Sequence, residues 1–420
     1  VGLHGIDDRG RILLPRRMSD NWARPQFDRP AEIGFTTAST TGKASLRLSW
    51  DPKAYIRQWR AGLLVDVYDG ALASGDTVTV VLGDTRFGSP GIQAQTFREE
   101  RCEFPVLIDA FGTGQYVHVP GAPAVRVIGA PAARLVVRGP SEVVAGEPFA
   151  ITVVAEDQYG NPADNYTEEV EIFVQGGEVR LPPAYGYGAG ERGAHRFEGI
   201  VIGRVGTYRI GARERGGRLQ GLGNPVVCSD QAPAERLYWG DLHGQTGTTV
   251  GTGTVAEYLA FGRDVAALDF ISHCANDFQI TEEHWQETKD GMRRFHEPGR
   301  YVTFLAYEWS GNTPAGGDHN VYYLGDDGPL HRSSHWQLAD KSDEADDRYP
   351  MSELQKTLRS RNDVMIIPHI GGRHANLDYF DAGFTPFIEI ASVHGVFEWF
   401  AHEALRRGLP VGFVCSSDDH

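Results

Sequence analysis

The sequence predicts a multidomain protein, with all-β sandwich domains at the N-terminal end followed by a barrel of alternating strands and helices. A chain of 420 residues is too long for one ordinary hydrophobic core. Up to about residue 235, the apolar residues come in short runs separated by Gly, Pro and Asp. Beyond that point, strand-like runs alternate with helical patterns, and histidines or carboxylates follow the strand-like runs.

Residues 1–130 are predicted to form a β-sandwich domain. Several of their apolar runs alternate with polar residues, as in residues 77–82, which is the pattern of a half-buried strand. A sandwich of antiparallel strands is the natural fold for about a hundred residues of this kind. The strands are expected at residues 44–50, 62–67, 77–82, 104–108, 116–119 and 125–128.

Residues 131–235 are predicted to form a second sandwich and a linker. The turn at Gly160, Asn161 and Pro162 interrupts the strand pattern sharply, and the segment resembles the immunoglobulin-like modules of bacterial proteins. That likeness concerns the fold alone. A binding role, for instance on carbohydrate, and a scaffold role beside the next domain both remain open. Strands are expected at residues 135–138, 149–154, 170–174 and 207–212, and the linker at Pro225 and residues 229–234.

Residues 236–420 are predicted to alternate strands and helices. Residues 237–246 should open as a strand and then place Asp241, His243 and Gln245 on the same side. Thr254 and Glu257 form a capping box for one helix, and Thr281 begins another. Repeated strand–helix units predict a parallel sheet and favour a barrel. The remaining strands are expected at residues 268–273, 302–308, 320–324, 364–369, 387–391 and 411–415, and further helices from residue 352 and at residues 397–407.

Imidazole and carboxylate groups stand at the carboxyl ends of these strands, where a β/α barrel carries its active site. Twelve of the fifteen histidines lie in residues 236–420. A single histidine at a strand end is usually structural, but this many converging on one rim predict a site for divalent metal ions. The residues concerned are His243, His273, Glu308, His369, His394, Asp418 and His420.

Other polar residues in this part of the chain have different expected places. His319 enters a strand at its start, so we expect it to support the reaction or hold substrate rather than bind metal, together with Asn320. Arg373 and His374 are candidates to hold an anionic group, and a surface loop is the alternative. His284, His296 and His402 fall on predicted helices and are expected at the surface.

The ordered motifs around His243, His273, His319, His369 and His420 resemble those of the polymerase-and-histidinol-phosphatase (PHP) superfamily, and more closely its branch of DUF3604 proteins. The resemblance covers residues 236–420. It implies a distorted (β/α)7 barrel that binds one to three divalent ions (Zn, Mn or Fe) and hydrolyses phosphoesters. The implied ligands are His243, His273, Glu308, His369, His394, Asp418 and His420.

One position departs from the superfamily pattern, because its second imidazole is replaced by Gln245. A glutamine oxygen can bind a metal or orient a water, although it binds zinc more weakly than imidazole does. We expect Asp418 to bind metal and help move a proton, and Glu308 to bridge two ions.

The function expected is therefore a metal-dependent hydrolase acting on a phosphoester through a metal-activated water. Two alternatives remain open. The same centre can hydrolyse an amide, a carboxyl ester or a sulfate ester. It can also be a non-catalytic metal site that stabilises a binding module, which predicts a closed centre ligated by protein alone.

Composition limits the partners and the compartment. The formal net charge of −16 argues against nucleic acid or an anionic membrane surface as the main partner, and no apolar run is long enough to cross a bilayer. A small, anionic substrate is expected. Four scattered cysteines suit a reduced compartment, so the cytoplasm is expected. Secretion or a periplasmic location stays open, because the chain begins at Val1 rather than Met and we expect it to be a piece of a longer protein that lacks its true N-terminus. We also expect the chain to be cut short at its C-terminal end, at His420.

Overall fold

The computed structural model describes residues 1–188 and 190–420. By its internal contacts the chain divides into two compact units, Val1–Gly129 and Ala130–His420. None of the helices in the described part of the chain has the length and hydropathy needed to span a bilayer.

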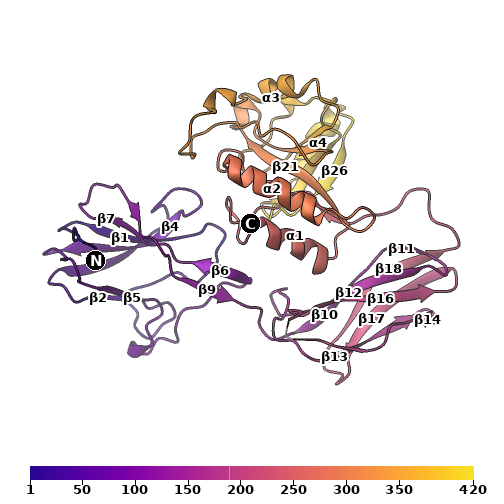
Figure 1. Cartoon of the computed structure of the whole chain (residues 1–420), viewed down its shortest axis with the longest axis horizontal. Coiled ribbons are helices and arrows are strands. Elements are labelled where there is room, and N and C mark those ends of the chain that lie inside the picture. The colour runs from indigo at the N-terminus through magenta and orange to yellow at the C-terminus, as the bar shows by residue number, and fades with distance from the viewer. Residues whose placement is uncertain (189) are drawn as a thin grey trace. The chain divides into compact units, whose positions relative to one another are not determined.

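The first unit is all β apart from one short 3-10 turn, and its strands carry the indigo and violet colours in Figure 1. Its main sheet has the order β3-β4-β1-β7-β8, and the pairs β2-β5 and β6-β9 complete the unit. Alternate residues of β1 face two cores, because Ile12 packs with Val65 and Val67 on one side and Leu13 with Leu107 on the other. The strands are β1 (Arg11–Arg16), β2 (Thr37–Thr40), β3 (Ser45–Asp51), β4 (Ala61–Tyr68), β5 (Val78–Val81), β6 (Glu99–Glu103), β7 (Leu107–Asp109), β8 (Val117–His118) and β9 (Ala124–Val127).

The second unit begins with an immunoglobulin-like sandwich of two sheets, β10-β12-β16-β14 and β11-β18-β17-β13-β15. One core of inward-facing side chains, such as Val153, Phe197 and Ile210, fills the space between them. The expected linker starts later than Pro225, because β18 continues through that residue. The strands are β10 (Arg134–Arg138), β11 (Glu142–Val144), β12 (Pro148–Glu156), β13 (Glu169–Gln175), β14 (Val179–Arg180), β15 (Tyr185–Gly186), β16 (Ala194–Ile202), β17 (Gly206–Glu214) and β18 (Gln220–Ser229).

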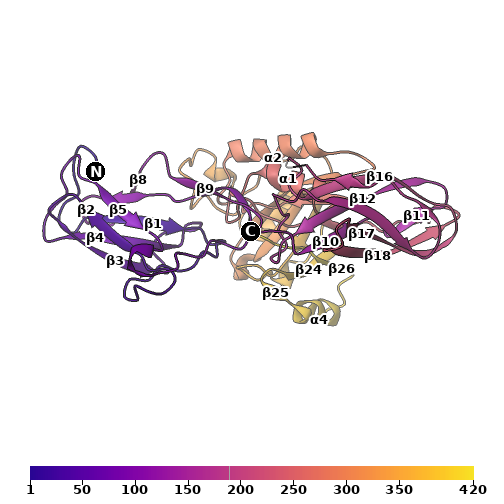
Figure 2. The same ribbon diagram turned by 90° about the horizontal axis from the view of Figure 1, so that it is seen from below.

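The rest of the second unit is a mixed α/β region with two sheets, β19-β20-β21-β22-β23 and β25-β24-β26. Figure 2 shows the second of these sheets beside α4. The strands are β19 (Gly240–Asp241), β20 (Phe270–His273), β21 (Val302–Ser310), β22 (Asp318–Tyr323), β23 (Val364–Pro368), β24 (Phe387–Ser392), β25 (Gly395–Val396) and β26 (Gly412–Cys415). The helices are α1 (Val255–Asp264), α2 (Glu282–Phe295), α3 (Met351–Leu358) and α4 (Glu398–Arg406).

The expected helix starts are confirmed, whereas the expected strand directions hold only in part. Capping boxes at Thr254 and Thr281 begin α1 and α2. The pairs β19–β20, β20–β21 and β24–β26 are parallel, but β22 runs antiparallel to both of its neighbours. The segment between β21 and β22 contains only a 3-10 turn, and a connection that short joins antiparallel strands.

The strand expected from Leu237 is also shorter than predicted. Only Gly240 and Asp241 pair as β19, and Leu237, Tyr238 and Trp239 are more than half exposed. The apolar pattern of these three residues therefore does not mark a core strand.

The two faces of the five-stranded sheet bury different kinds of side chain. One face packs on α1, α2 and α3 through residues such as Leu305, Tyr307 and Val321. The opposite face carries a smaller cluster that includes Cys274, Ala306, Tyr322 and Ile367. The polar cluster described next lies at the end of this second face.

Candidate metal centre

The hairpin of β21 and β22 places four polar side chains on one face. Glu308 lies opposite Asn320 and Ser310 opposite Asp318, and residues directly opposite each other in an antiparallel pair share a face. His369 follows β23 next to this group, because its backbone N–H donates to Asp318 O at 3.2 Å. All of these residues except Ser310 are almost completely buried.

The last residues of the chain meet the segment after β19. Asp418 N donates to His243 O at 2.8 Å, Ser417 Oγ donates to the same oxygen at 2.9 Å, and Gly244 forms a parallel bridge with Asp419. Asp418 has a φ of 47°, a region that residues other than glycine rarely occupy. These backbone bonds hold it there, and its buried carboxylate faces His243.

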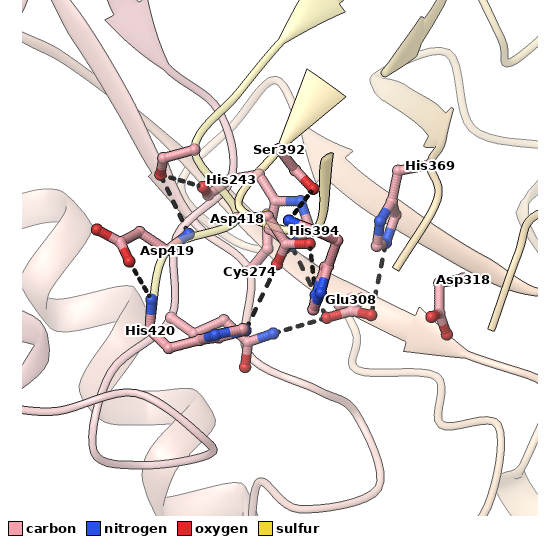
Figure 3. Close-up of polar contacts among 12 residues, drawn as sticks. His243, Cys274, Glu308, Asp318, His369, Ser392, His394, Asp418, Asp419 and His420 are labelled. Carbon is pink, nitrogen blue, oxygen red and sulfur yellow. Dashed lines mark hydrogen bonds and ion pairs between the residues drawn. The ribbon is translucent and has the colours of Figure 1, made fainter. Parts of the chain in front are cut away.

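Three overlapping groups of side chains have potential ligand atoms within 4.8 Å of one another. Asp418 belongs to the first and second groups, and His369 to the first and third, so the groups adjoin. In Figure 3, Glu308 lies in the middle of the cluster. His369 and Asp318 lie on one side of it, and Asp418, His394 and His420 lie on the other side. The first group is His243, His369, Glu389 and Asp418, the second His394, Asp418 and His420, and the third Glu308, Asp318 and His369.

The side chains at the centre form ion-pair contacts, but several of their atoms make no hydrogen bond. His243 Nε2 lies 3.2 Å from Asp418 Oδ1 and 3.8 Å from Glu308 Oε2, and His369 Nε2 lies 3.4 Å from Glu308 Oε1. Yet His243 Nε2, both ring nitrogens of His369 and Glu389 Oε2 are buried without a hydrogen-bond partner among the described residues. Buried polar atoms are normally satisfied. Lone pairs that converge on one volume from imidazole and carboxylate fit a divalent cation.

The charges within the cluster strongly shift its pKa values. Burial opposes protonation of His243, but the charges of Asp418 and Glu389 outweigh it and raise the pKa of the imidazole well above its usual value. Burial would raise the pKa of Glu308, but its contacts with His243 and His369 lower it well below normal. A cation would satisfy the same carboxylates in place of these protons.

A second buried carboxylate is held by an arginine. Asp318 accepts hydrogen bonds from the backbone N–H of Arg373 at 2.8 Å and from its Nε at 2.7 Å. Burial, followed by the nearby charge of Glu308, raises the pKa of Asp318 to about 6, although Arg373 opposes the shift. Gly371 is needed beside this pair, because a Cβ there would lie 2.9 Å from Asp318 Oδ2.

Gln245 contacts Glu308 through its amide nitrogen, and its oxygen is already engaged. Gln245 Nε2 donates to Glu308 Oε2 at 2.8 Å, and Thr249 Oγ1 donates to Gln245 Oε1 at 2.5 Å. Asn276 Nδ2 donates to the same Glu308 oxygen at 2.5 Å. The two amides fix the Glu308 carboxylate and leave Oε1 facing His369.

His273 and His319 lie outside these groups. His273 Nε2 contacts Thr246 Oγ1 at 3.0 Å and its ring lies near Tyr258 of α1. The imidazole of His319 contacts Gly317 O through Nδ1 and lies against Trp309. Burial lowers the pKa of each imidazole to about 4, so both are neutral. Their neighbours on the same strands, Ser272 and Asn320, take the opposite face.

The residues expected to hold substrate occupy different surroundings. Arg373 is largely buried beside Asp318, with its guanidinium 5.2 Å from the centre of the Phe278 ring. His374 is exposed and lies near Trp399. Asn320 is fully buried, and both polar atoms of its side chain lack a hydrogen-bond partner among the described residues.

Sequence reasoning missed Glu389 and Asp318. Glu389 is a single charge inside the apolar strand β24, and it is 2% exposed with Oε1 3.1 Å from His243 Nδ1. A carboxylate in the middle of a buried strand was the available signal. The sequence predicts a role for His319 rather than for its neighbour Asp318, because it does not determine which of two adjacent strand residues faces the site.

These features define a β-rich chain that ends in a mixed α/β region with a buried histidine–carboxylate cluster. Residues 245–376 match the sequence model of the family described as "Protein of unknown function (DUF3604)". The resemblance to DUF3604 proteins is thus confirmed for this stretch. It contains Glu308, Asp318 and His369 of the cluster, whereas His243, Glu389, His394, Asp418 and His420 lie outside it.

Distant relatives occur in Chlamydia. Uncharacterized proteins of Chlamydia muridarum and Chlamydia trachomatis serovar D are each 22% identical over 430 residues, which covers 95% of this chain and 66% of theirs. One of Chlamydia pneumoniae is 24% identical over 356 residues, or 83% of this chain and 55% of its own length. The chain thus spans at most about two thirds of these relatives, and none of their names states an activity.

Solved structures add little. The D00-D0 domain of intimin is 11% identical with a TM-score of 0.24, covering 52% of this chain and 100% of that one. The Escherichia coli adhesin FdeC is 14% identical with a TM-score of 0.23, covering 55% and 67%. Such low scores carry no argument about function.

Proposed function

We propose that this chain is a metal-dependent hydrolase of the PHP superfamily that cleaves a phosphoester. The observation that carries the proposal is the convergence of unsatisfied, buried imidazole and carboxylate atoms in three adjoining groups. The strand order supports a distorted barrel, because residues 243–245 pair with residues 417–419 and so link the two sheets. His243, Glu308, His369 and Asp418 then lie near or beyond the carboxyl ends of β19, β21, β23 and β26, as in β/α-barrel enzymes, whereas Asp318 opens the antiparallel β22 and Glu389 stands within β24.

The residues divide into holders of cations and residues that orient them. His243, His369, Glu389 and Asp418 would hold one ion, and the groups around His394 and Glu308 would hold neighbouring ions. When bound, such ions lower the pKa of a water and offset charge that develops on the attacked phosphorus. Hydrogen bonds from Gln245 and Asn276 orient the carboxylate of Glu308. A hydrogen bond from Arg373 orients the carboxylate of Asp318 in the same way.

Exposure at one edge of the cluster favours catalysis over a purely structural metal. The first group is buried throughout and alone resembles a closed structural site. In the second group, however, the His394 side chain is 39% exposed and that of His420 is 22% exposed. Asp418 itself is buried, so a substrate would approach the centre from the exposed edges of His394 and His420. If the second group holds no ion, His394 and His420 would instead be free to bind a phosphoryl oxygen or to give a proton to the leaving group.

Metal analysis combined with a substrate panel tests the proposal. We expect the purified chain to bind Zn, Mn or Fe tightly and, once loaded, to hydrolyse aryl phosphate monoesters or diesters. His369→Gln should lose both properties, whereas His402→Gln, an exposed histidine on α4, should keep them. Turnover only of carboxyl esters, amides or sulfate esters would overturn the phosphoesterase assignment. Tight metal binding with no turnover of any kind would support the structural alternative.

A further inference from the structure

A second concave site lies within the second unit, between the immunoglobulin-like sandwich and the start of the α/β region. It is a cavity of about 460 Å³, within the usual size range of small-molecule sites. Its walls come from β10, β11 and β12 on one side, and from residues 236–239 and the loops before β20 and β21 on the other. Trp239 Nε1 donates to Ser141 Oγ at 2.9 Å and so joins the two sides.

Arginines dominate the charge of this cavity, although the chain as a whole is acidic. Five arginines line it against three carboxylates. Two of those carboxylates are already engaged by backbone, since Glu142 Oε2 accepts from Leu237 N and Asp269 Oδ2 accepts from Trp239 N. The arginines are Arg138, Arg196, Arg236, Arg263 and Arg300.

The partners of these arginines leave donors free for a ligand. Four of the five pair with a carboxylate that does not line the cavity, as Arg300 Nη1 does with Glu297 at 2.9 Å. Arg236 has no ion pair among the described residues. A guanidinium has five N–H donors, so one carboxylate at one edge does not exhaust it. Arginine side chains that line one cavity are a common means of recognising phosphate, sulfate or carboxylate groups.

Two exposed aromatic rings stand beside these charges. Tyr238 is 62% exposed and Trp239 is 57% exposed, and both line the cavity. The rings can pack against a sugar or another flat ring while the arginines bind its anionic group. A ligand-binding role for these rings accounts for the apolar residues 237–239, which the sequence predicts in a strand and which are exposed to solvent in the structure.

The cavity is separate from the metal centre. Trp239 and Asp269 stand at the starts of β19 and β20, whereas His243 and the cluster stand beyond their ends. None of the residues in the three metal-binding groups lines the cavity.

We propose that this cavity is a binding site for a small molecule that carries an oxyanion group on a ring, such as a phosphorylated, sulfated or carboxylated sugar. The inference does not depend on the proposed hydrolase activity. It gives the sandwich a ligand-binding role, because Arg138 and Arg196 come from its strands.

Calorimetric titration of the full chain tests this site with defined probes. Glucose 6-phosphate, glucose 6-sulfate and glucuronate represent the three anionic groups, and glucose is the neutral control. We expect saturable binding of at least one anionic sugar, no binding of glucose, and weaker binding as salt rises. Combining Arg236→Gln with Arg300→Gln should weaken binding by about tenfold or more. Arg215→Gln, which breaks an exposed pair with Glu169 elsewhere on the sandwich, should leave it unchanged.

Each titration is performed on metal-loaded and on chelated protein, because the metal centre can also bind anions. Binding that persists after chelation and is lost in the double variant supports the cavity. Binding lost on chelation, equal binding by the double variant, or no saturable binding of any anionic probe would overturn it. Unfolding curves that superimpose for the double variant and Arg215→Gln would show that lost binding reflects the site rather than the fold.

Discussion

The immunoglobulin-like sandwich and the α/β region both bury carboxylates, but they differ in whether the buried charged groups have hydrogen-bond partners. In the sandwich, Glu156 is 3% exposed and accepts hydrogen bonds from Arg134 and Arg138. Asp157 is 1% exposed, and hydrogen bonds from the Asn161 side chain and from backbone N–H groups outweigh burial and lower its pKa. In the α/β region, by contrast, His243, His369 and Glu389 keep buried atoms without a hydrogen-bond partner among the described residues.

Burial of a charged side chain does not by itself mark a functional site. A buried charge whose bonds are complete fixes a fold, as Glu156 does between two strands of one sheet. Buried polar atoms that make no hydrogen bond, on side chains that point toward one another, need a further binding partner.

Chelation should separate the two regions most strongly. If cations complete the cluster, saturating metal at about a thousand times its Kd stabilises the α/β region by about 4 kcal/mol. The sandwich should gain nothing. Calorimetry with and without chelator should show one transition that moves and one that does not. A single transition that moves would mean that the two regions unfold as one cooperative body.

Removing the amides that orient Glu308 should weaken the centre without emptying it. Gln245→Ala or Asn276→Ala leaves Glu308 Oε2 without one of its donors. We expect metal affinity or turnover to fall about 10-fold to 100-fold. Gln286→Ala on the exposed face of α2 is the matched control. Unchanged affinity and turnover in both site variants would show that Glu308 needs no orientation.

Glu156→Gln should produce the reverse pattern. It removes the charge shared by two arginines that are themselves partly exposed. We expect the sandwich to lose about 2 kcal/mol of unfolding free energy. Metal content and turnover should remain those of the unaltered chain. A fall in metal content would show that the two regions are energetically coupled.

The pH dependence of stability should change sign with metal. In chelated protein, the raised pKa values of His243 and His369 contribute stability that is complete below the ordinary value of 6.5 and is lost as pH rises through the raised values. In loaded protein, cations need neutral imidazoles, so affinity should rise with pH by up to about tenfold per pH unit for each proton displaced. Unfolding curves at pH values below and above 6.5 measure how the unfolding free energy depends on pH, once with metal and once with chelator. Parallel slopes would contradict ligation by these imidazoles.

Asn320 should show the smallest effect on stability. Its two polar atoms lack protein partners, so Asn320→Leu should raise the unfolding free energy by about 1 kcal/mol. If the amide holds substrate, kcat/KM should fall at the same time while metal content is unchanged. A loss of stability would instead indicate that ordered water satisfies Asn320.

Much of the centre could be predicted because strand ends are visible in the sequence. His243, Glu308, His369, His394, Asp418 and His420 follow or end predicted strands, and the structure brings them together. His273 was predicted by the same rule but faces α1, because adjacent residues of a strand point to opposite faces. Glu389 lies within strand β24, whereas the prediction considered only residues at the ends of strands.

Local patterns in the sequence predict a β-rich part followed by an α/β part, the capped starts of α1 and α2, and most of the strand-end imidazoles and carboxylates of the cluster. These are local properties, set by apolar period and by capping chemistry within a few residues. The tertiary structure decided the antiparallel turn into β22, and with it the choice of Asp318 over His319. Strand pairing joins residues far apart in the chain, and a shift of one residue exchanges the two faces of a strand, so no local pattern could have made that choice.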